Sequence, residues 1–221
     1  MRPVRVITVS REYGSGGAAI GQKLADRLCW KLLDRELIVE IARRAHMQPS
    51  EIMPMDEHPA SAIARALRSF WIGNYYGWST PPSDVTDQDY LANLTQMVIL
   101  EAAKLGHCVI VGRGAQCALR DQPDAFHVFV YGSTEEKLKR IQARDPKAVV
   151  DESVLDQIDA ARAGYIRQYY RCDWMNPHLY HLMVDSDLGL DRAVSIILSA
   201  AELAHEGAHA AASSSRMRSH S

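Results

Sequence analysis

The sequence predicts a three-layer α/β/α domain built on a five-stranded parallel sheet. Three observations carry this prediction. Apolar, β-rich runs alternate with segments of helical periodicity, a later run is apolar throughout, and the first run leads into a glycine cluster. Alternating strands and helices are typical of a parallel sheet covered on both faces. Strands buried on both faces read as continuous apolar runs. The 221 residues therefore predict one α/β domain.

Each element is expected from a local pattern. The five expected strands are the segments 4–9, 31–34, 108–111, 126–131 and 180–184. Between them, apolar residues recur three and four apart, as on the buried face of a helix. Ser133, followed by one threonine and two glutamates, predicts a helix start, because serine caps helix N-termini and acids suit the first turn.

The chain is organised around this domain, which we assign to residues 1–205. About 70 residues separate the second and third strands, more than one crossover needs, so we expect an insert at about 46–106. The basic stretch at about 140–170 is expected to be a lid. Residues 206–221 have the composition of a disordered tail.

Composition excludes several classes of protein. The formal net charge is −2, which argues against a general nucleic-acid-binding surface. No apolar run is long enough for a membrane span or a signal peptide. The four cysteines match no zinc or redox spacing, and we predict no metal site. We therefore expect a cytoplasmic protein with reduced cysteines.

The glycine cluster is the most informative motif. An apolar strand leads into Gly14, Ser15, Gly16 and Gly17, and a helical pattern follows. Glycines let several backbone N–H groups point inward, and a helix N-terminus adds partial positive charge. The order strand, glycine turn, helix therefore predicts a phosphate-binding loop for ATP.

The loop departs from the common ATP-binding motif, G-x-x-x-x-G-K-[ST]. With Gly16 as the second glycine, Arg11 stands at the first glycine, Gly17 at the lysine and Ala18 at the hydroxyl position. Two alternatives remain. One is a dinucleotide fingerprint, Gly14, Gly16 and Ala19 with Asp34 as the acid; the other is a structural turn. We favour the ATP loop, because four residues separate the strand from the first glycine.

Two further positions follow strand ends. Gly112-Arg113-Gly114 comes after the third strand, and ligands of parallel sheets bind beyond the carboxyl ends of the strands. Arg113 can present a bidentate fork to a phosphate, although a solvated surface turn is the alternative. Asp34 ends the second strand and is expected either to cap a helix or to bind a sugar hydroxyl.

The basic stretch supplies candidate lid residues. Phosphoryl transfer needs positive charge around the phosphate oxygens, which a closing basic segment can provide. Asp159 and Arg162 are three residues apart and share one helical face. The other lid candidates are Arg140, Arg144 and Arg167. A solvated helix face is the alternative for each of them.

The expected insert is rich in aromatic residues. The group is Phe70, Trp71, Tyr75, Tyr76 and Trp78. These side chains are suited to stacking a base, to local packing or to a homodimer surface. Packing or an interface is the more common use of aromatics, so a homodimer through the insert is one expectation.

Taken together, these motifs resemble the cytidylate kinase-like family of P-loop nucleoside monophosphate kinases over residues of about 4–200. The likeness lies in ITVSREYGSGG with IGQKLADRL, in LLDRELI, in VIVGRGA, in VFVYGSTEEKLKRI, and more weakly in RAGYIRQYY and YHLMVDS. The resemblance implies a P-loop kinase fold and transfer of a phosphoryl group from ATP, with Mg²⁺, to CMP or dCMP. It implies that residues 14–17 hold ATP, that Asp34, Arg113 and Asp159 bind the acceptor, and that Arg162 clamps phosphate.

The chain departs from authentic cytidylate kinases, which carry the loop lysine and an acid just before the Gly-Arg pair. Here those positions are Gly17 and Val111, and Ala18 follows where relatives of this branch tend to have a polar residue. We expect Arg11, together with Arg162, to supply the missing positive charge. Two alternatives to a nucleoside monophosphate kinase remain: a nucleotide-binding sensor or partner-binding module, and a kinase of another small acceptor.

Overall fold

The computed structural model describes residues 3–34 and 88–202. Within them, five strands form one parallel sheet with the order β2-β3-β1-β4-β5. The strands are β1 (Val6–Arg11), β2 (Lys31–Leu33), β3 (Cys108–Val111), β4 (Ala125–Tyr131) and β5 (Leu182–Asp185). The helices are α1 (Gly17–Leu28), α4 (Gln88–Leu105), α5 (Ala115–Ala118), α6 (Thr134–Arg144), α7 (Glu152–Tyr170) and α8 (Leu190–Ala200), with short 3₁₀ turns η2 (Pro177–Leu179) and η3 (Ser186–Leu188).

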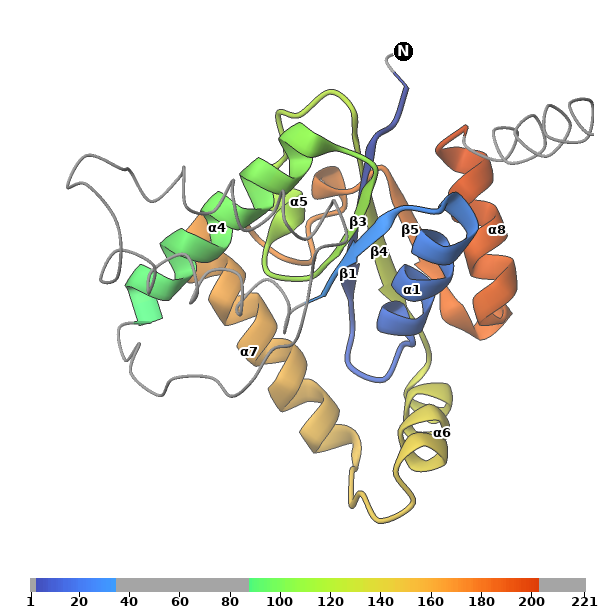
Figure 1. Cartoon of the computed structure of the whole chain (residues 1–221). Helices are drawn as coiled ribbons and strands as arrows, with labels where there is room; N and C mark the ends of the chain where they lie inside the picture. Colours follow the sequence, from blue (N-terminus) through green and yellow to red (C-terminus); the bar gives the residue numbers. More distant parts are fainter. Residues whose placement is uncertain (1–2, 35–87, 203–221) are drawn as a thin grey trace, which may run out of the picture.

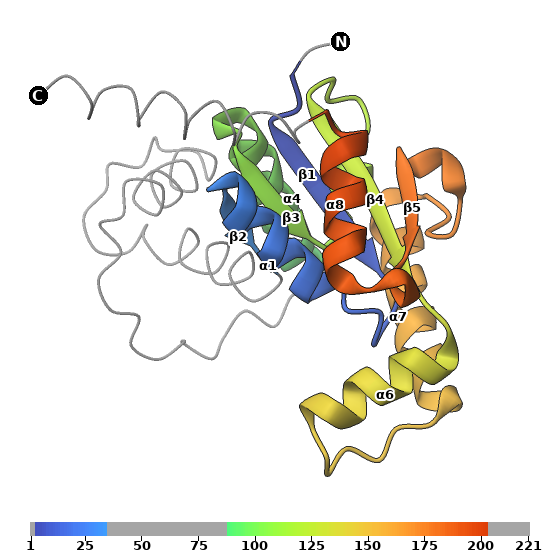
Figure 2. The same ribbon diagram turned by 90° about the vertical axis from the view of Figure 1, so that its right-hand side faces the viewer.

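Helices cover both faces of the sheet, so the molecule has three layers (Figure 1). One core joins the sheet to α1 and α8, with Ile20, Leu24 and Val194 fully buried against it. The other core joins the sheet to α4 and α5, and its centre includes Val98 and Ile110. Figure 2 shows α1 and α8 together on one side of the strands. The predicted three-layer fold with a five-stranded parallel sheet is confirmed.

The third strand was predicted at its observed bounds, whereas the bounds of the first were wrong at both ends. The strand expected at 4–9 is β1, Val6–Arg11, two residues further along. Its polar end stays in the sheet because Ser10 and Arg11 pair with Phe129 and Val130 of β4. The fifth strand likewise begins two residues later than expected, at Leu182, because the chain turns through η2 first.

Two helix starts show why α6 and α7 begin where they do. Ser133 caps α6, as predicted, by accepting a hydrogen bond from the Glu136 amide at 3.3 Å. Asp151 caps α7 in the same way, with the Val154 amide at 3.0 Å. The two helices project together from one end of the sheet (Figures 1 and 2). They cover most of the segment expected to form a lid.

Two other expectations fall wholly or partly outside the described residues. The aromatic group at 70–78 and the tail at 206–221 both lie there. The last part of the expected insert is α4, whose buried side chains pack on the sheet. No helix among residues 3–34 and 88–202 is long and apolar enough to cross a membrane.

Candidate functional site

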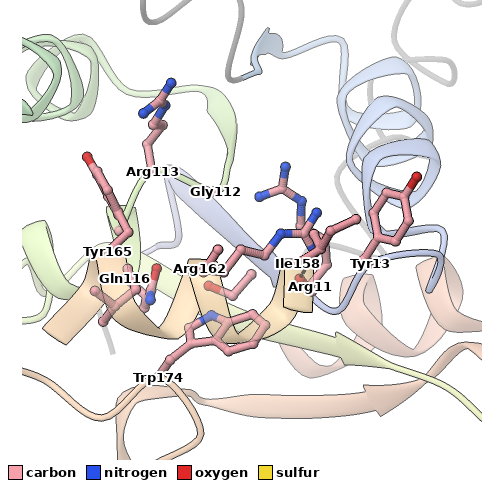
Figure 3. Close-up of a pocket in the computed structure, with 13 residues that line it drawn as sticks. Arg11, Tyr13, Gly112, Arg113, Gln116, Ile158, Arg162, Tyr165 and Trp174 are labelled. Carbon is pink, nitrogen blue, oxygen red and sulfur yellow. Dashed lines mark hydrogen bonds between the residues drawn. The ribbon is translucent and has the colours of Figure 1, made fainter. Parts of the chain in front are cut away.

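The candidate site is a cavity of about 520 Å³ at the carboxyl ends of the central strands. The end of β1, the turn between β3 and α5, and the inner face of α7 line it. The full lining is Ser10, Arg11, Tyr13, Gly112, Arg113, Gly114, Gln116, Ile158, Ala161, Arg162, Tyr165, Ile166 and Trp174. Three arginines from three separate elements therefore approach one cavity (Figure 3).

The glycine loop beside this cavity has the backbone that its sequence predicts. Gly14 and Gly16 have φ values of +82° and +79°, a region that residues with a side chain rarely adopt. Gly16 caps α1 and has no side chain to accept a hydrogen bond from the first turn of that helix. Ser15 is fully buried, and its hydroxyl donates to the Glu12 carbonyl at 2.8 Å. The Ser15 hydroxyl thus maintains the shape of the loop.

Arg11 occupies the space that a side chain at Gly17 would need. A Cβ added at Gly17 would lie 2.8 Å from Cγ of Arg11 and closer still to its Cβ. Such contacts are too short for any real side chain, so Gly17 and the stem of Arg11 fit each other. The loop lacks a lysine at this position, and the aliphatic part of an arginine fills the gap.

The far end of Arg11 reaches the neighbouring turn. A Cβ added at Gly112 would lie 3.0 Å from Cζ of Arg11 and would collide with its guanidinium Nη1. The Gly112 amide in turn donates to the Val9 carbonyl at 3.0 Å. Arg11 therefore extends from the glycine loop to the β3–α5 turn, and both Gly17 and Gly112 leave room for it.

A buried ion pair supports the loop from the side of α6. Lys137 Nζ lies 3.1 Å from Glu12 Oε2, and the two side chains are only 10% and 19% exposed. The Gly132 amide also donates to Glu12, at 3.4 Å. Lys137 packs directly against Gly14, whose added Cβ would lie 3.0 Å from the Lys137 Cβ. Charge and close packing together fix the loop against α6.

Asp159 and Arg162 connect α7 to the same loop. The Tyr13 amide donates to Asp159 Oδ1 at 2.8 Å, and Arg162 Nη1 donates to the Arg11 carbonyl at 2.8 Å. The two side chains also pair with each other at 3.1 Å. Burial raises the pKa of Asp159 above its ordinary value, against the opposing effects of the Tyr13 amide and Arg162. The predicted pair thus shares one face of α7 and clamps the loop.

Arg113 is held in an unusual backbone conformation. Gly112, Arg113 and Gly114 have consecutive φ values of +81°, +57° and +72°. A non-glycine residue in this region carries strain, which tends to occur at functional sites. The Tyr170 hydroxyl donates to the Arg113 carbonyl at 3.0 Å and fixes the turn. A side chain at Gly114 is excluded, because its Cβ would lie 2.8 Å from Cζ of Tyr170.

The guanidinium of Arg113 contacts an aromatic ring and no acid of the described chain. Its Cζ lies 5.7 Å from the centre of the Tyr165 ring, a cation–π distance. Its buried Nε has no hydrogen-bond partner within residues 3–34 and 88–202. In Figure 3 the side chains of Arg113 and Tyr165 lie toward one end of the cavity, and Arg11 lies toward the other.

The remaining predicted residues lie outside the cavity lining. Asp34 follows the carboxyl end of β2, and β2 pairs with β3 in the sheet. Arg140 donates to Ser186 Oγ and O, both at 3.0 Å, and so connects α6 to η3. Arg144 and Arg167 are exposed in the last turns of α6 and α7.

Sequence reasoning missed several residues of the site. Tyr165 and Trp174 line the cavity together with Gln116, and Glu12 with Lys137 supports the loop. Spacing gave no direct signal for the Glu12–Lys137 pair, since 125 positions separate the two residues. Gln116 had a usable signal: it is a polar residue three positions after Arg113 in an otherwise apolar stretch.

The residues present do not form a resident Mg²⁺ site. Ala18 stands where an ATP loop offers a hydroxyl, and the Ser15 hydroxyl bonds to Glu12. The nearby carboxylates of Glu12 and Asp159 hold Lys137 and Arg162. Within the described ranges, no group of three histidine, cysteine or acidic side chains is placed to hold a metal ion.

Strand order, glycine loop and arginine-lined cavity together define a P-loop kinase fold. The structure is similar to that of an uncharacterized protein from Eubacterium ventriosum ATCC 27560, with 23% identity, coverage of 90% of this chain and 98% of that one, and a TM-score of 0.64. It is also similar to shikimate kinase from Bacteroides thetaiotaomicron, with 14% identity, coverage of 90% and 99%, and a TM-score of 0.51. At these identities the similarity establishes the fold alone.

The chain belongs to the cytidylate kinase-like family, whose model matches residues 6–188. This match confirms the resemblance predicted from the motifs. No curated protein sequence matches the chain at a significant level.

Proposed function

We propose that the protein transfers a phosphoryl group from ATP to a nucleoside monophosphate, with CMP or dCMP as the expected acceptor. The observation that carries this proposal is the position of Arg11. Its stem fills the missing side-chain space at Gly17, and its guanidinium reaches Gly112 in the β3–α5 turn. A cation that spans two phosphate-binding elements is suited to a reaction that moves phosphate between them.

Each element has a role in the proposed reaction. Residues 14–17 bind the phosphates of ATP through backbone amides at the start of α1. Arg113 binds the phosphate of the acceptor with its guanidinium fork. Arg11 and Arg162 stabilise the charge on the transferred group, which passes through a transition state with three charged equatorial oxygens. The chemistry therefore depends on position and charge.

Two hydrogen bonds join the loop to α7. Arg162 binds the Arg11 carbonyl, and Asp159 binds the Tyr13 amide. A lid helix that is bound to the donor loop keeps Arg162 near the phosphates during transfer. In this scheme Asp159 is a positioning residue, because it orients Arg162 at 3.1 Å. Mg²⁺ enters as part of the MgATP substrate, in keeping with the kinase family.

One specific observation favours a second candidate, a nucleotide-binding module with little catalysis. The loop has glycine and alanine where kinases use a lysine and a hydroxyl. Backbone amides suffice to bind a nucleotide, whereas transfer also needs the added charge. The two candidates therefore differ in whether Arg11 and Arg162 restore the lost electrostatic contribution.

The test is ATP turnover, with Mg²⁺, against a panel of nucleoside monophosphates, with the binding of each compound measured in parallel. The kinase predicts ADP formation that depends on the acceptor and is fastest with CMP or dCMP. ATP binding without turnover on any acceptor would instead establish the binding module. Turnover confined to an acceptor without phosphate, such as a sugar or shikimate, would overturn the nucleotide assignment and retain the kinase.

A further inference from the structure

Two free thiols that are far apart in the sequence lie together in the fold. Cys117 belongs to α5, and Cys172 lies just beyond the end of α7. Cys117 is part of a small buried cluster with Phe129, Ile166 and Trp174, and Cys172 packs against this cluster. The two thiols also share a hydrogen bond. Their sulfur atoms are therefore neighbours.

The backbone around each cysteine is fixed against the other segment. The Tyr170 hydroxyl donates to the Arg113 carbonyl at 3.0 Å. The Tyr170 ring also fills the space at Gly114, where an added Cβ would lie 2.8 Å from its Cζ. The Cys172 thiol donates to the Tyr170 carbonyl at 3.2 Å. Since Gly114 is close to Cys117 in the chain, these contacts keep the end of α7 against α5.

The two thiols differ in exposure and in acidity. Cys117 is 7% exposed, and burial raises the pKa of its thiol to about 12, with further contributions from Cys172 and the hydrogen bond between them. A thiol reacts as its thiolate, so Cys117 is unreactive toward an oxidant at neutral pH. Cys172 is only half-buried, so a small oxidant reaches this thiol first. The oxidised Cys172 sulfur then faces the Cys117 thiol.

We propose that Cys117 and Cys172 form a redox-modification site, at which hydrogen peroxide converts the two thiols into a disulfide that joins α5 to the end of α7. In the first step the Cys172 thiolate attacks one peroxide oxygen. An S–O bond forms and the O–O bond breaks, which leaves a sulfenic acid on Cys172. The second peroxide oxygen leaves as hydroxide and takes up the proton that Cys172 released.

In the second step the Cys117 sulfur attacks the sulfenic sulfur of Cys172. The S–S bond forms, the S–O bond breaks, and the departing hydroxyl takes the Cys117 proton and leaves as water. Two electrons pass from the thiols to one peroxide, which becomes two molecules of water. Attack on the disulfide by a small-molecule thiol reverses the reaction.

The disulfide would link two walls of the cavity. Gln116 and Trp174, which are close in the chain to Cys117 and Cys172, both line it (Figure 3). The spacing of the cysteines in the sequence gives no sign of this pair, because α5 and the end of α7 meet only in the folded chain. The inference goes beyond the proposed function, since it needs only the two thiols and the oxidant.

The test treats the full chain with hydrogen peroxide and then counts thiols by alkylation after unfolding. It uses Cys29→Ser as the reference, because Cys29 is exposed and would itself react. We expect the reference to lose two thiols and dithiothreitol to restore both. Mass spectrometry after trypsin digestion should find the peptides of Cys117 and Cys172 joined.

Two further variants, each made on the reference, separate the two steps. Cys117→Ala should form no disulfide, and dimedone should trap the sulfenic acid on Cys172. Cys172→Ser should keep its remaining thiols reduced. It changes only a half-buried side chain, so it keeps the test decisive if Cys117→Ala does not fold. Circular dichroism would check the fold of each variant.

Thermal unfolding gives a second readout. A bond between segments already in contact constrains the unfolded chain most, so oxidation should raise the Tm of the reference by about 5–10 °C. The Tm of Cys172→Ser should not respond to peroxide. Four results would each overturn the site: no loss of thiols in the reference, a disulfide that involves another cysteine or a second chain, equal thiol loss in Cys172→Ser, or an unchanged or lower Tm after oxidation.

Discussion

In the glycine loop, polar groups bond to the protein itself: the Ser15 hydroxyl to the Glu12 carbonyl, and the Glu12 carboxylate to Lys137. In the β3–α5 turn, the buried Arg113 Nε has no hydrogen-bond partner within residues 3–34 and 88–202. The loop is therefore fixed by contacts within the chain and offers mainly its backbone. The turn keeps a side-chain donor of Arg113 available. Under the proposed function, the glycine loop recognises phosphate through its backbone, and the β3–α5 turn recognises it through a charged side chain.

The largest effect should come from a change in the loop backbone. Gly16 has a φ of +79°, and a Cβ there would lie 2.7 Å from Cδ2 of Leu190. Gly16→Val places a β-branched residue in a conformation that it rarely adopts. We expect ATP binding to be lost while cooperative unfolding is retained at lower stability, as measured by calorimetry and circular dichroism.

The matched control for this change is Gly164→Ala on α7, where an added Cβ meets nothing within 4 Å. Alanine is the better helix former, so this variant should bind ATP normally and unfold at slightly higher temperature. An unchanged ATP affinity in folded Gly16→Val would show that the loop does not bind the nucleotide.

The next effect tests the residue that joins the two regions. If the protein is a kinase, Arg11→Ala should lower kcat by about 10²–10³-fold, as is typical when an electrostatic contributor to a transition state is removed. The effect on nucleotide affinity should be smaller. Steady-state kinetics supply the measurement. Arg120→Ala is the control, because Arg120 is exposed and pairs with Asp121. Full turnover in Arg11→Ala would mean that another cation supplies the charge.

Acid should destabilise the sheet that carries both regions. Burial lowers the pKa of His127 from 6.5 to about 4, with a further contribution from His181. The unfolded chain thus binds this proton more readily, and stability should fall as the pH drops from about 6.5 towards 4. The difference in pKa between the folded and unfolded chain corresponds to a loss of about 3 kcal/mol in the free energy of unfolding at the acid end of this range.

Urea unfolding at pH 7, 5.5 and 4 would measure this loss of stability. In His127→Gln the fall over the same pH range should be smaller by about that amount, since the titrating group is gone. An identical pH dependence in the wild type and the variant would rule out His127 as its source. Because the sheet supports both regions, acid should weaken ATP and acceptor binding together.

The smallest effect should be confined to the acceptor side. Arg113→Lys keeps the charge but loses the planar fork and much of the contact with Tyr165. We expect the KM of the acceptor to rise about 10-fold, in line with the loss of a charge-assisted hydrogen bond, with little change in the KM of ATP. Kinetics with each substrate varied in turn give the measurement. Arg192→Lys, exposed on α8, is the control. Equal acceptor KM values in the wild type and Arg113→Lys would show that Arg113 does not bind the acceptor phosphate.

The fold was predictable because its signals are local. Apolar runs such as Cys108–Val111 and the cap at Ser133 each depend on neighbouring residues. The boundaries of β1 were harder to predict from the sequence, since Arg11 remains in the strand only because Val130 pairs with it. Burial of the outermost residues of a strand is decided by partners that sequence spacing does not reveal.

The site was predictable in part. The glycine loop, Arg113 and the pair of Asp159 and Arg162 follow from motif and helical spacing. The position of Gln116 on the cavity wall depends on how a short helix packs, and a polar residue in an apolar stretch has several explanations. Arg140 shows the converse case, because its basic neighbours suggest a lid and its contacts join α6 to η3.

The mutual fit of Arg11 and Gly17 also constrains how this chain can change. A lysine introduced at position 17 would meet the Arg11 stem, and a small residue at position 11 would leave the loop without either cation. We expect the two positions to show strong epistasis: each single replacement impairs the protein, and only the pair places a glycine and a lysine where the common motif has them. A lineage that holds arginine and glycine here needs these two coordinated steps, and a third at Ala18, to reach that motif.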